Sequence, residues 1–417
     1  MLRRTLWATA LAFFAAGLVI AQRIDSSELL AKILARVHAN GRSLSRYICR
    51  QRIVRRSWVP QHSSGKGCIA NPVGGTAPQG AKLATLDRVS LDVIVTRETE
   101  MFSWPGASHF EARDPGEVLR YGGLSEKGDF GAFLSAIFGQ SGVKFHYDGP
   151  AAGGLVRFSY EVPQAVSGFE MRGARGVGIV GYEGSFDADP RTGDLVRVEV
   201  QTMGAPSGSG LCGAWEQIRY LHQQGESKLL VPEQTATAMF SADGHYAENQ
   251  TSYEACRQYG VEATLKFDDD ATPVAVPAKD MPPPSPPPPG TEFIIRLATA
   301  IDSESAWAGD RIEGTLAAPA IDPATHKVVA PAGSLFRGRV TQIEHDYEPA
   351  RDVIVGLTFN AIVLNGVDVP VTLVRAEPGA TGVWAFRGRK KAVLAKGFES
   401  RWRVRTKEDE FLIAPVR

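Results

Sequence analysis

The sequence predicts an α+β fold that is mainly antiparallel β, with a helix packed on a curved sheet and a small all-β domain after it. Three observations predict it. One amphipathic helix opens the chain, alternating apolar and polar residues dominate the segments after that helix, and a proline-rich segment separates two such regions. The 417 residues suffice for two or three domains, and a 43% hydrophobic content lets each bury a core.

The segment 1–21 predicts a signal peptide. Arg3 and Arg4 precede an uncharged apolar run that ends at Ile20, and we expect cleavage after Ala21. The alternative is an uncleaved membrane anchor. No later segment is long and apolar enough to span a bilayer, so we expect a periplasmic or secreted protein without a membrane span after cleavage.

The first domain, 22–270, is predicted to begin with a helix. Asp25 can cap it, and Glu28 stands where a capping box places its glutamate. Its apolar stripe, which recurs at helical spacing, is Leu29, Leu30, Ile33, Leu34 and Val37. Asn40-Gly41 predicts the end of the helix. A second, short helix is predicted at 129–139, with its phenylalanines on one face.

Period-two alternation predicts the strands of this domain. They are 89–96, 156–162, 195–200, a strand around Trp215 to Tyr220, and 263–267 at the end. The stretch GVGIVG, Gly176 to Gly181, matches the letters of a dinucleotide-binding loop. Such a loop needs a helix after its third glycine, whereas YEGSFDADPRTG has no helical period. We therefore predict a glycine-rich strand and no nucleotide cofactor.

The segment 271–290 is predicted to be an extended linker, because seven of its last nine residues are proline. The second domain, 291–417, is almost all strand by the same alternation. Asn365-Gly366 between two apolar runs is a strong hairpin signal. We predict a small barrel or sandwich there.

Four cysteines in an exported chain predict two disulfides. The cysteines are Cys49, Cys68, Cys212 and Cys256, and three connectivities are available. We expect the local pairs Cys49–Cys68 and Cys212–Cys256. Zinc is the rival interpretation, but the spacing lacks any C-x-x-C or close Cys/His pair, so no metal is predicted.

The segment from Arg387 to Lys407 holds nine basic residues and one acid. Its Arg401, Arg403 and Arg405 are predicted to share one face of a strand. This face is a candidate contact for anionic envelope polymers, lipid headgroups or a partner, and the alternative is a solvated strand face. Equal numbers of basic and acidic residues over the whole chain argue against a nucleic-acid partner.

The order of a helix, the strand RYICRQRIVRR and the hairpin GSFDADPRTGDLVRVEV resembles the periplasmic lipoprotein-carrier and lipoprotein-sorting fold. That resemblance implies an unclosed half-barrel that wraps a helix over an apolar cavity, and it covers roughly 25–267. The second domain, with VVAPAGSLFRGRV, is similar to the small β-barrels of conjugation and secretion-channel proteins. This second resemblance implies that the domain is a scaffold, and it implies no activity.

These observations predict a non-enzymatic, exported cell-envelope protein. Its first domain would bind an apolar ligand, a lipid or a lipid-modified partner, and other envelope proteins are candidate partners. No hydrolase motif occurs in the sequence, and no catalytic, cofactor-binding or metal-binding residue is predicted. The alternatives are a structural or assembly factor without a ligand, and a secreted hydrolase whose triad forms from distant residues.

Overall fold

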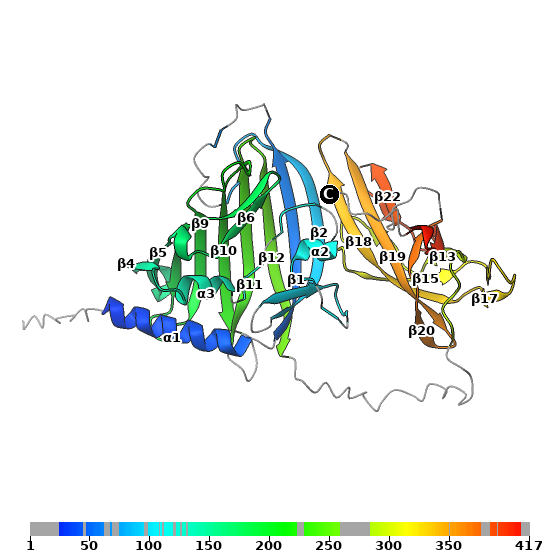
Figure 1. Ribbon diagram of the computed structural model, residues 1–417, viewed down its shortest axis with the longest axis horizontal. Helices are drawn as coiled ribbons and strands as arrows, with labels where there is room; N and C mark the ends of the chain where they lie inside the picture. The colour runs from blue at the N-terminus through cyan, green and yellow to red at the C-terminus, as the bar shows by residue number, and fades with distance from the viewer. Residues whose placement is uncertain are drawn as a thin grey trace, which may run out of the picture.

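A computed structural model shows two strand-rich regions side by side, joined in one 18-stranded sheet (Figure 1). The predicted signal peptide, the strand 263–267 and most of the linker lie outside the described residues. The structure describes residues 25–44, 47–61, 67–68, 75–95, 99–107, 109–110, 112–119, 122–125, 127–130, 132–222, 229–258, 284–349, 351–376, 384–389 and 391–409.

The first domain is a long antiparallel sheet whose strands follow the order β4–β5–β8–β9–β10–β11–β12–β1–β2–β3. A separate hairpin, β6–β7, precedes β8. The strands are β1 (Tyr47–Val59), β2 (Lys82–Val95), β3 (Glu100–Ser103), β4 (Lys144–Pro150), β5 (Val156–Val162), β6 (Glu170–Gly173), β7 (Gly176–Ile179), β8 (Tyr182–Ala188), β9 (Leu195–Thr202), β10 (Leu211–His222), β11 (Leu230–Ser241) and β12 (Tyr246–Gln258).

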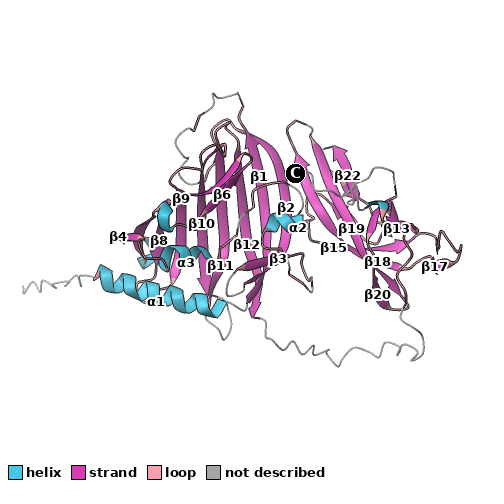
Figure 2. Cartoon of the chain, viewed as in Figure 1, coloured by secondary structure: helices cyan, strands magenta, loops and turns pink. Residues whose placement is uncertain are grey.

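Three α-helices in the described residues pack against this sheet (Figure 2): α1 (Ser26–Leu44), α2 (Pro115–Leu119) and α3 (Ala132–Phe138). We call the sheet face beneath α1 and α3 the inner face, and the opposite one the outer face. Asp25 caps α1 as predicted, by accepting hydrogen bonds from the backbone N–H groups of Ser27 and Glu28. The predicted stop at Asn40-Gly41 is wrong: the helix runs to Leu44, and the Asn40 side chain is hydrogen-bonded to β11.

The second domain is built from strands, as predicted, on a core of apolar side chains that includes Phe336, Phe359 and Trp402. The Asn365-Gly366 hairpin joins β19 to β20, with both turn residues at positive φ. The strands are β13 (Glu292–Leu297), β14 (Ile301–Asp302), β15 (Arg311–Leu316), β16 (Ala320–Ile321), β17 (Val328–Ala330), β18 (Leu335–Asp346), β19 (Asp352–Leu364), β20 (Val367–Pro370), β21 (Leu373–Arg375), β22 (Trp384–Arg389), β23 (Val393–Leu394) and β24 (Glu399–Val404).

The sheet is open, and the described residues form no uninterrupted closed barrel. The strand that would close a ring is broken at Val371 and Thr372 into β20 and β21. One of these pairs with β19 and the other with β24. The predicted small barrel is corrected to this broken arrangement, which continues into the sheet of the first domain.

The two domains meet by strand pairing at the edge of β2. Residues 344–346 of β18 pair with 85–87, a bridge joins Ala308 to Val89, and β3 pairs with 92–95. The edge of β2 is therefore covered along most of its length, which removes a template for unwanted strand association. It also explains why Ser90 and Asp92, two polar residues of this alternating strand, are buried.

The first four residues of GVGIVG form a strand, as predicted. Gly176–Ile179 forms β7, which pairs with β6 in a hairpin, and β8 follows at Tyr182. No helix begins at Gly181 within this described stretch, so the third glycine presents no helix N-terminus to a pyrophosphate.

The local disulfide pairing predicted from the sequence is wrong. Cys49 is bonded to Cys256 and Cys68 to Cys212, across separations of 207 and 144 residues. The reason is the sheet order, since β1 pairs with β12 and brings the two ends of the first domain together. Two disulfides indicate an oxidising, extracytoplasmic environment. Among the described residues no helix has the length and hydropathy needed to cross a membrane.

Candidate functional site: the inner face of the first domain

One end of the inner face is an aromatic cluster, which we call the aromatic end. Phe186 of β8 stacks on Phe158 at 5.3 Å between ring centroids and meets Phe138 of α3 edge-on at 5.1 Å. Tyr182 lies between Phe133 and Phe169, at 5.6 Å from each. These rings come from β5, β8, α3 and the segment before β6, so tertiary packing assembles them.

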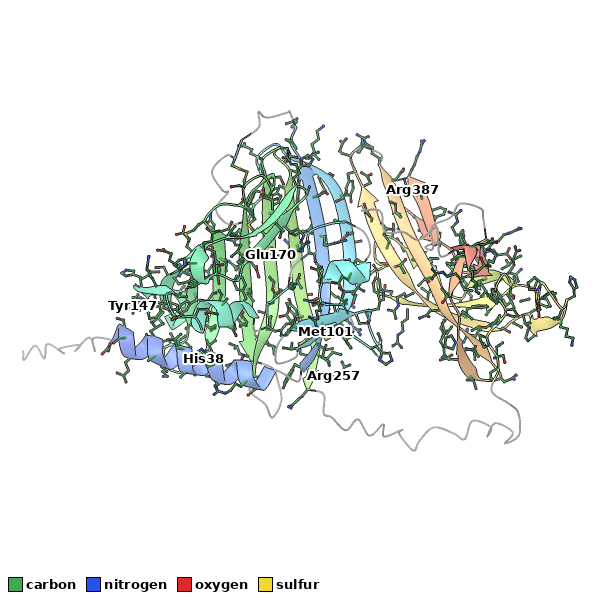
Figure 3. All side chains as sticks on the ribbon, viewed as in Figure 1. His38, Met101, Tyr147, Glu170, Arg257 and Arg387 are labelled. Atoms are coloured by element: carbon green, nitrogen blue, oxygen red, sulfur yellow. A yellow bond between two sulfur atoms is a disulfide. The ribbon has the colours of Figure 1, made fainter. Side chains whose placement is uncertain are left out.

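Most of this cluster is buried, but the side chains at its border are partly exposed. Phe158, Tyr182 and Phe186 are buried, whereas Phe169 is half-buried. Tyr147, labelled in Figure 3, is also half-buried and lies on β4 at the free edge of the sheet. The cluster therefore reaches from the core to the surface.

The aromatic end contains a buried hydroxyl that has no partner in the described part of the chain, that of Tyr182. The side chain of Tyr182 is fully buried, and its hydroxyl has no hydrogen-bond partner among the described residues. A buried hydroxyl without a partner costs about 1–3 kcal/mol of stability. The Tyr182 ring packs against phenylalanine rings, while Tyr160 and the charge of Glu216 are also close to it.

Helices α1 and α3 cover the aromatic end. The predicted stripe of α1 is confirmed: Leu29, Ile33 and Val37 are buried in the same core as the aromatic side chains. The opposite side of α1 faces solvent, as expected for an amphipathic helix. In Figure 1 the helix crosses the lower ends of several strands.

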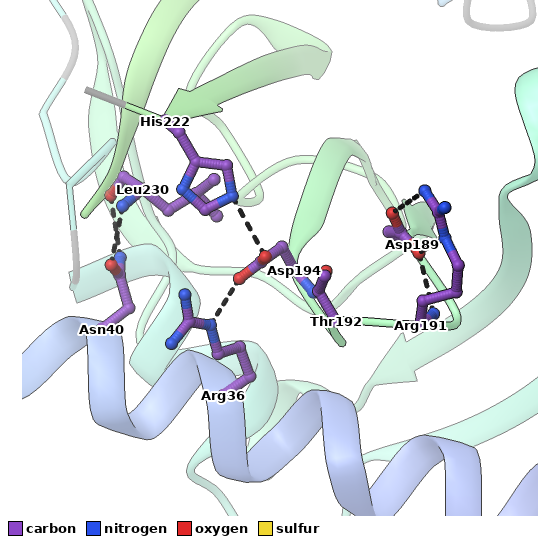
Figure 4. Close-up of polar contacts among 8 residues, drawn as sticks. All are labelled: Arg36, Asn40, Asp189, Arg191, Thr192, Asp194, His222 and Leu230. Atoms are coloured by element: carbon purple, nitrogen blue, oxygen red, sulfur yellow. Dashed lines mark hydrogen bonds and ion pairs between the residues drawn. The ribbon is translucent and has the colours of Figure 1, made fainter. Parts of the chain in front are cut away.

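Polar contacts at the border hold α1 in place, and we call them the clasp (Figure 4). Arg36 pairs with Asp194, which also lies 3.0 Å from Nε2 of His222. Burial raises the pKa of Asp194, but the Arg36 hydrogen bond and charge outweigh it and leave that pKa lowered. The Asn40 amide donates to the carbonyl of Leu230 at 2.8 Å and accepts from its N–H at 2.9 Å.

The middle of the inner face is polar, and we call it the polar centre. Glu100 is buried and accepts hydrogen bonds from the backbone N–H groups of Gly128 and Phe130 at 2.7 and 3.0 Å. Burial, and the nearby Asp129, raise the pKa of Glu100 to about 7. The carboxyl therefore fixes the segment that leads into α3.

Asp129 extends this network onto the sheet. It accepts hydrogen bonds from Thr235 at 2.7 Å and from the hydroxyl of Tyr253, which in turn accepts one from Gln51 at 3.0 Å. Burial raises the pKa of Asp129 despite these donors, and a hydrogen bond with Glu216 opposes that rise. Three carboxyl side chains thus share one buried, hydrogen-bonded region.

A buried ion pair completes the polar centre. Arg55 of β1 contacts Asp87 of β2 through Nε, at 2.8 and 3.0 Å from the two carboxylate oxygens. Both side chains are buried, and the guanidinium lies directly against Gly123. Burial raises the pKa of Asp87, and the hydrogen bond from Arg55 opposes that shift.

Arg401 and Arg403 alternate with Trp402 on β24, whereas Arg405 lies just after the strand and is half-buried. Arg401 is exposed and Arg403 is half-buried, while Trp402 between them is buried. Arg403 pairs with Asp409 at 2.8 Å, so it is not a free cation. Contact of Arg401, Arg403 and Arg405 with an anionic surface stays a prediction.

Neither the polar centre nor the clasp was predicted from the sequence. Glu100, Asp129 and Glu216 are far apart in the chain, and only the pairing of successive strands from β10 to β3 brings them together. The one available signal was the run of inward-facing threonine and asparagine on β11 and β12, where apolar residues would be expected. No group of histidine, cysteine and carboxylate side chains in the described part of the chain is arranged to hold a metal ion.

Comparison with known proteins gives one structural similarity. No family model matches the chain, and no curated protein matches its sequence. The chain is similar to the crystal structure of a LolA superfamily protein from Nitrosomonas europaea, with 10% identity and a TM-score of 0.21. The match covers 58% of this chain and 97% of that one. The strand pairings alone define the fold given above.

Proposed function

We propose that the protein is a non-enzymatic component of the cell envelope that binds a lipid, or the acyl chain of a lipid-modified partner, at the aromatic end. The observation that carries this proposal is the Tyr182 hydroxyl, a buried and unpartnered group on a ring that packs against Phe133 and Phe169. An ester or carboxyl oxygen at the head of an acyl chain would accept its hydrogen bond. The rings would contact the hydrocarbon.

Binding at this site requires the cover to move. The aromatic side chains pack against α3 and α1, so an acyl chain has to displace a helix to reach them. The clasp is polar and lies at the border, where water can replace its hydrogen bonds when it opens. Each such bond is worth about 0.5–1.5 kcal/mol net, and the acyl chain would replace the apolar contacts that Leu29, Ile33 and Val37 lose when α1 moves.

The first test is the lipid content of the full chain purified after export. We expect mass spectrometry of an organic extract to find phospholipid or fatty acid in near-stoichiometric amount. We also expect a fluorescent fatty acid to bind the delipidated protein. Absence of both would overturn the proposal.

Variants locate the site. Tyr182→Phe removes only the hydroxyl and should weaken fatty-acid binding about five- to tenfold. Arg36→Ala combined with Asn40→Ala should strengthen apparent binding about fivefold, because a larger fraction of molecules is open. His38→Ala is the matched control, since His38 is exposed on the same helix (Figure 3). Equal affinity of all three variants would exclude the aromatic end.

A second candidate is an assembly factor without a ligand. The pairing of β18 with β2 favours it, because this junction holds two domains in one sheet and would suit a rigid scaffold. The two candidates separate on the same experiment, since a scaffold predicts no bound lipid and no effect of Tyr182→Phe on any lipid probe.

A further inference from the structure

The outer face of the first domain carries a groove that the proposed function does not use. It has a volume of about 440 Å³ and runs across β10, β11, β12 and β1. At one end it is bounded by Trp307, which comes from the second domain. The groove lies on the opposite side of the sheet from the aromatic end, so a ligand here is independent of the lipid site.

Strand register arranges polar side chains in a row along this groove. Arg219, Gln234, Ser252 and Arg52 lie directly opposite one another on four neighbouring strands. Neighbouring strands are 4.7–4.9 Å apart, so the two arginine positions are roughly 14 Å apart.

A second row, two residues further along each strand, adds more amides. Gln217 and Gln250 stand on either side of Ala236, whose small side chain deepens the groove. A neighbouring hollow of about 340 Å³ shares Ala236 and Gln250 and extends the groove toward Trp215. Its carboxylate, Glu248, is paired with Arg56 at 3.0 Å.

The two arginines of the first row differ in their partners. The guanidinium of Arg52 lies 5.2 Å from the centroid of the Trp307 ring and pairs with Glu254 at 3.1 Å. It is therefore held in place. Arg219 is exposed and has no ion pair among the described residues. No carboxylate lines the 440 Å³ groove, so a charged ligand here would be an anion.

We propose that this groove binds an acidic polysaccharide chain. Glutamine amides and the serine hydroxyl both donate and accept hydrogen bonds, as sugar hydroxyls do. Arg219 would pair with a carboxylate of the chain. The spacing of the arginine positions and the row of amides suit an extended polymer with repeating polar groups, whereas a small anion would find, among the described groove residues, only Arg219 without an ion pair, because Arg52 is paired with Glu254.

The test uses the full chain and two soluble polymers, polygalacturonate as the acidic polysaccharide and dextran as its neutral counterpart. We expect binding of polygalacturonate that weakens as NaCl rises from 50 to 500 mM, and weaker binding of dextran. Arg219→Gln and Gln234→Ala should each weaken polygalacturonate binding about fivefold or more. Arg172→Gln makes the same charge change on the exposed β6–β7 hairpin and should have no effect.

Three results would overturn the proposal: no binding of polygalacturonate, equal binding of the two polymers, or unchanged binding in both groove variants. Vesicles containing anionic phospholipid form a separate arm. Vesicle binding that depends on Arg219, without polysaccharide binding, would assign the groove to lipid headgroups instead. Because Tyr182 lies on the other face, failure here leaves the fatty-acid result unchanged, and the reverse also holds.

Discussion

The aromatic end and the polar centre share one inner sheet face, but the first is packed with aromatic rings and the second is filled by hydrogen-bonded polar side chains. At the aromatic end, phenylalanine rings fill the space beneath α1 and α3, and one hydroxyl has no partner. At the polar centre, buried carboxyl groups are hydrogen-bonded, as Glu100 is to two backbone N–H groups, although Oδ1 of Asp129 and Oε1 of Gln51 have no partner among the described residues. Dispersion contacts tolerate a change of occupant, whereas a buried network is stable only when its groups are satisfied. Under the proposed function, a ligand would therefore enter at the aromatic end, and the polar centre would stay packed.

The largest expected effect is at the ion pair of the polar centre. Arg55→Met leaves the Asp87 carboxylate buried without its partner and should lower the free energy of unfolding by about 3–5 kcal/mol. Urea denaturation followed by circular dichroism measures it. Arg56→Met is the matched control, because its pair with Glu248 is more exposed and should cost about 1 kcal/mol or less. Equal losses of unfolding free energy in the two variants would mean that the buried ion pair stabilises the protein no more than the more exposed one.

The next effect is a loss of stability with rising pH. The unfolded Glu100 ionises near its ordinary pKa of 4.5, whereas the folded one ionises near 7. Between these values the unfolded state binds fewer protons, so stability falls as pH rises, by an amount on the order of 3 kcal/mol. Chemical denaturation at several pH values checks this. In Glu100→Gln the slope between pH 4.5 and 7 should become shallower, and an unchanged slope would assign the titration elsewhere.

The same chemical change should have opposite signs in the two regions. Tyr253→Phe removes a hydroxyl that donates to Asp129 and should destabilise by about 1–2 kcal/mol. Tyr182→Phe removes a buried hydroxyl without a partner and should stabilise by about 1 kcal/mol. Thermal or urea unfolding of both variants measures the sign of each stability change. If Tyr182→Phe also destabilises, that hydroxyl has a partner and the proposed lipid site loses its anchor.

The smallest expected effect concerns the cover of the aromatic end. Asp25→Ala removes the N-cap of α1 and should cost about 1 kcal/mol of helix stability. We expect faster hydrogen exchange in the first turns of α1 and little change at the polar centre. Exchange that rises equally in both regions would mean that the cover and the polar centre open together.

Local patterns predicted a good part of the fold. The Asp25 cap, the apolar stripe of α1 and the alternating strands follow from contacts within a few residues, so the sequence shows them directly. The disulfide pairing did not follow, because Cys49 and Cys256 meet only once β1 and β12 are neighbours. The predicted end of α1 failed for a similar reason, since Asn40 is hydrogen-bonded to a residue 190 positions away.

The candidate site was less predictable than the fold. The aromatic side chains were visible as phenylalanines on a short helix, but Tyr182 and its unpartnered hydroxyl depend on packing around it. The junction at β2 could not be anticipated, because a proline-rich linker predicts two independent domains. The pairing of 85–87 with 344–346 instead makes them one sheet.

A fluorophore placed in the aromatic end tests directly whether an acyl chain binds there. Phe169→Trp adds an indole beside Tyr182 and Phe133, whereas Trp58, Trp104, Trp215, Trp307 and Trp402 belong to other clusters or to the domain junction, and Trp384 lies on β22 of the second domain. Titration with a brominated fatty acid, which quenches an indole only at contact distance, should remove the added emission and leave the wild-type emission nearly unchanged. If the brominated chain binds and the added emission persists, the acyl chain lies elsewhere and the proposed lipid site at the aromatic end is wrong.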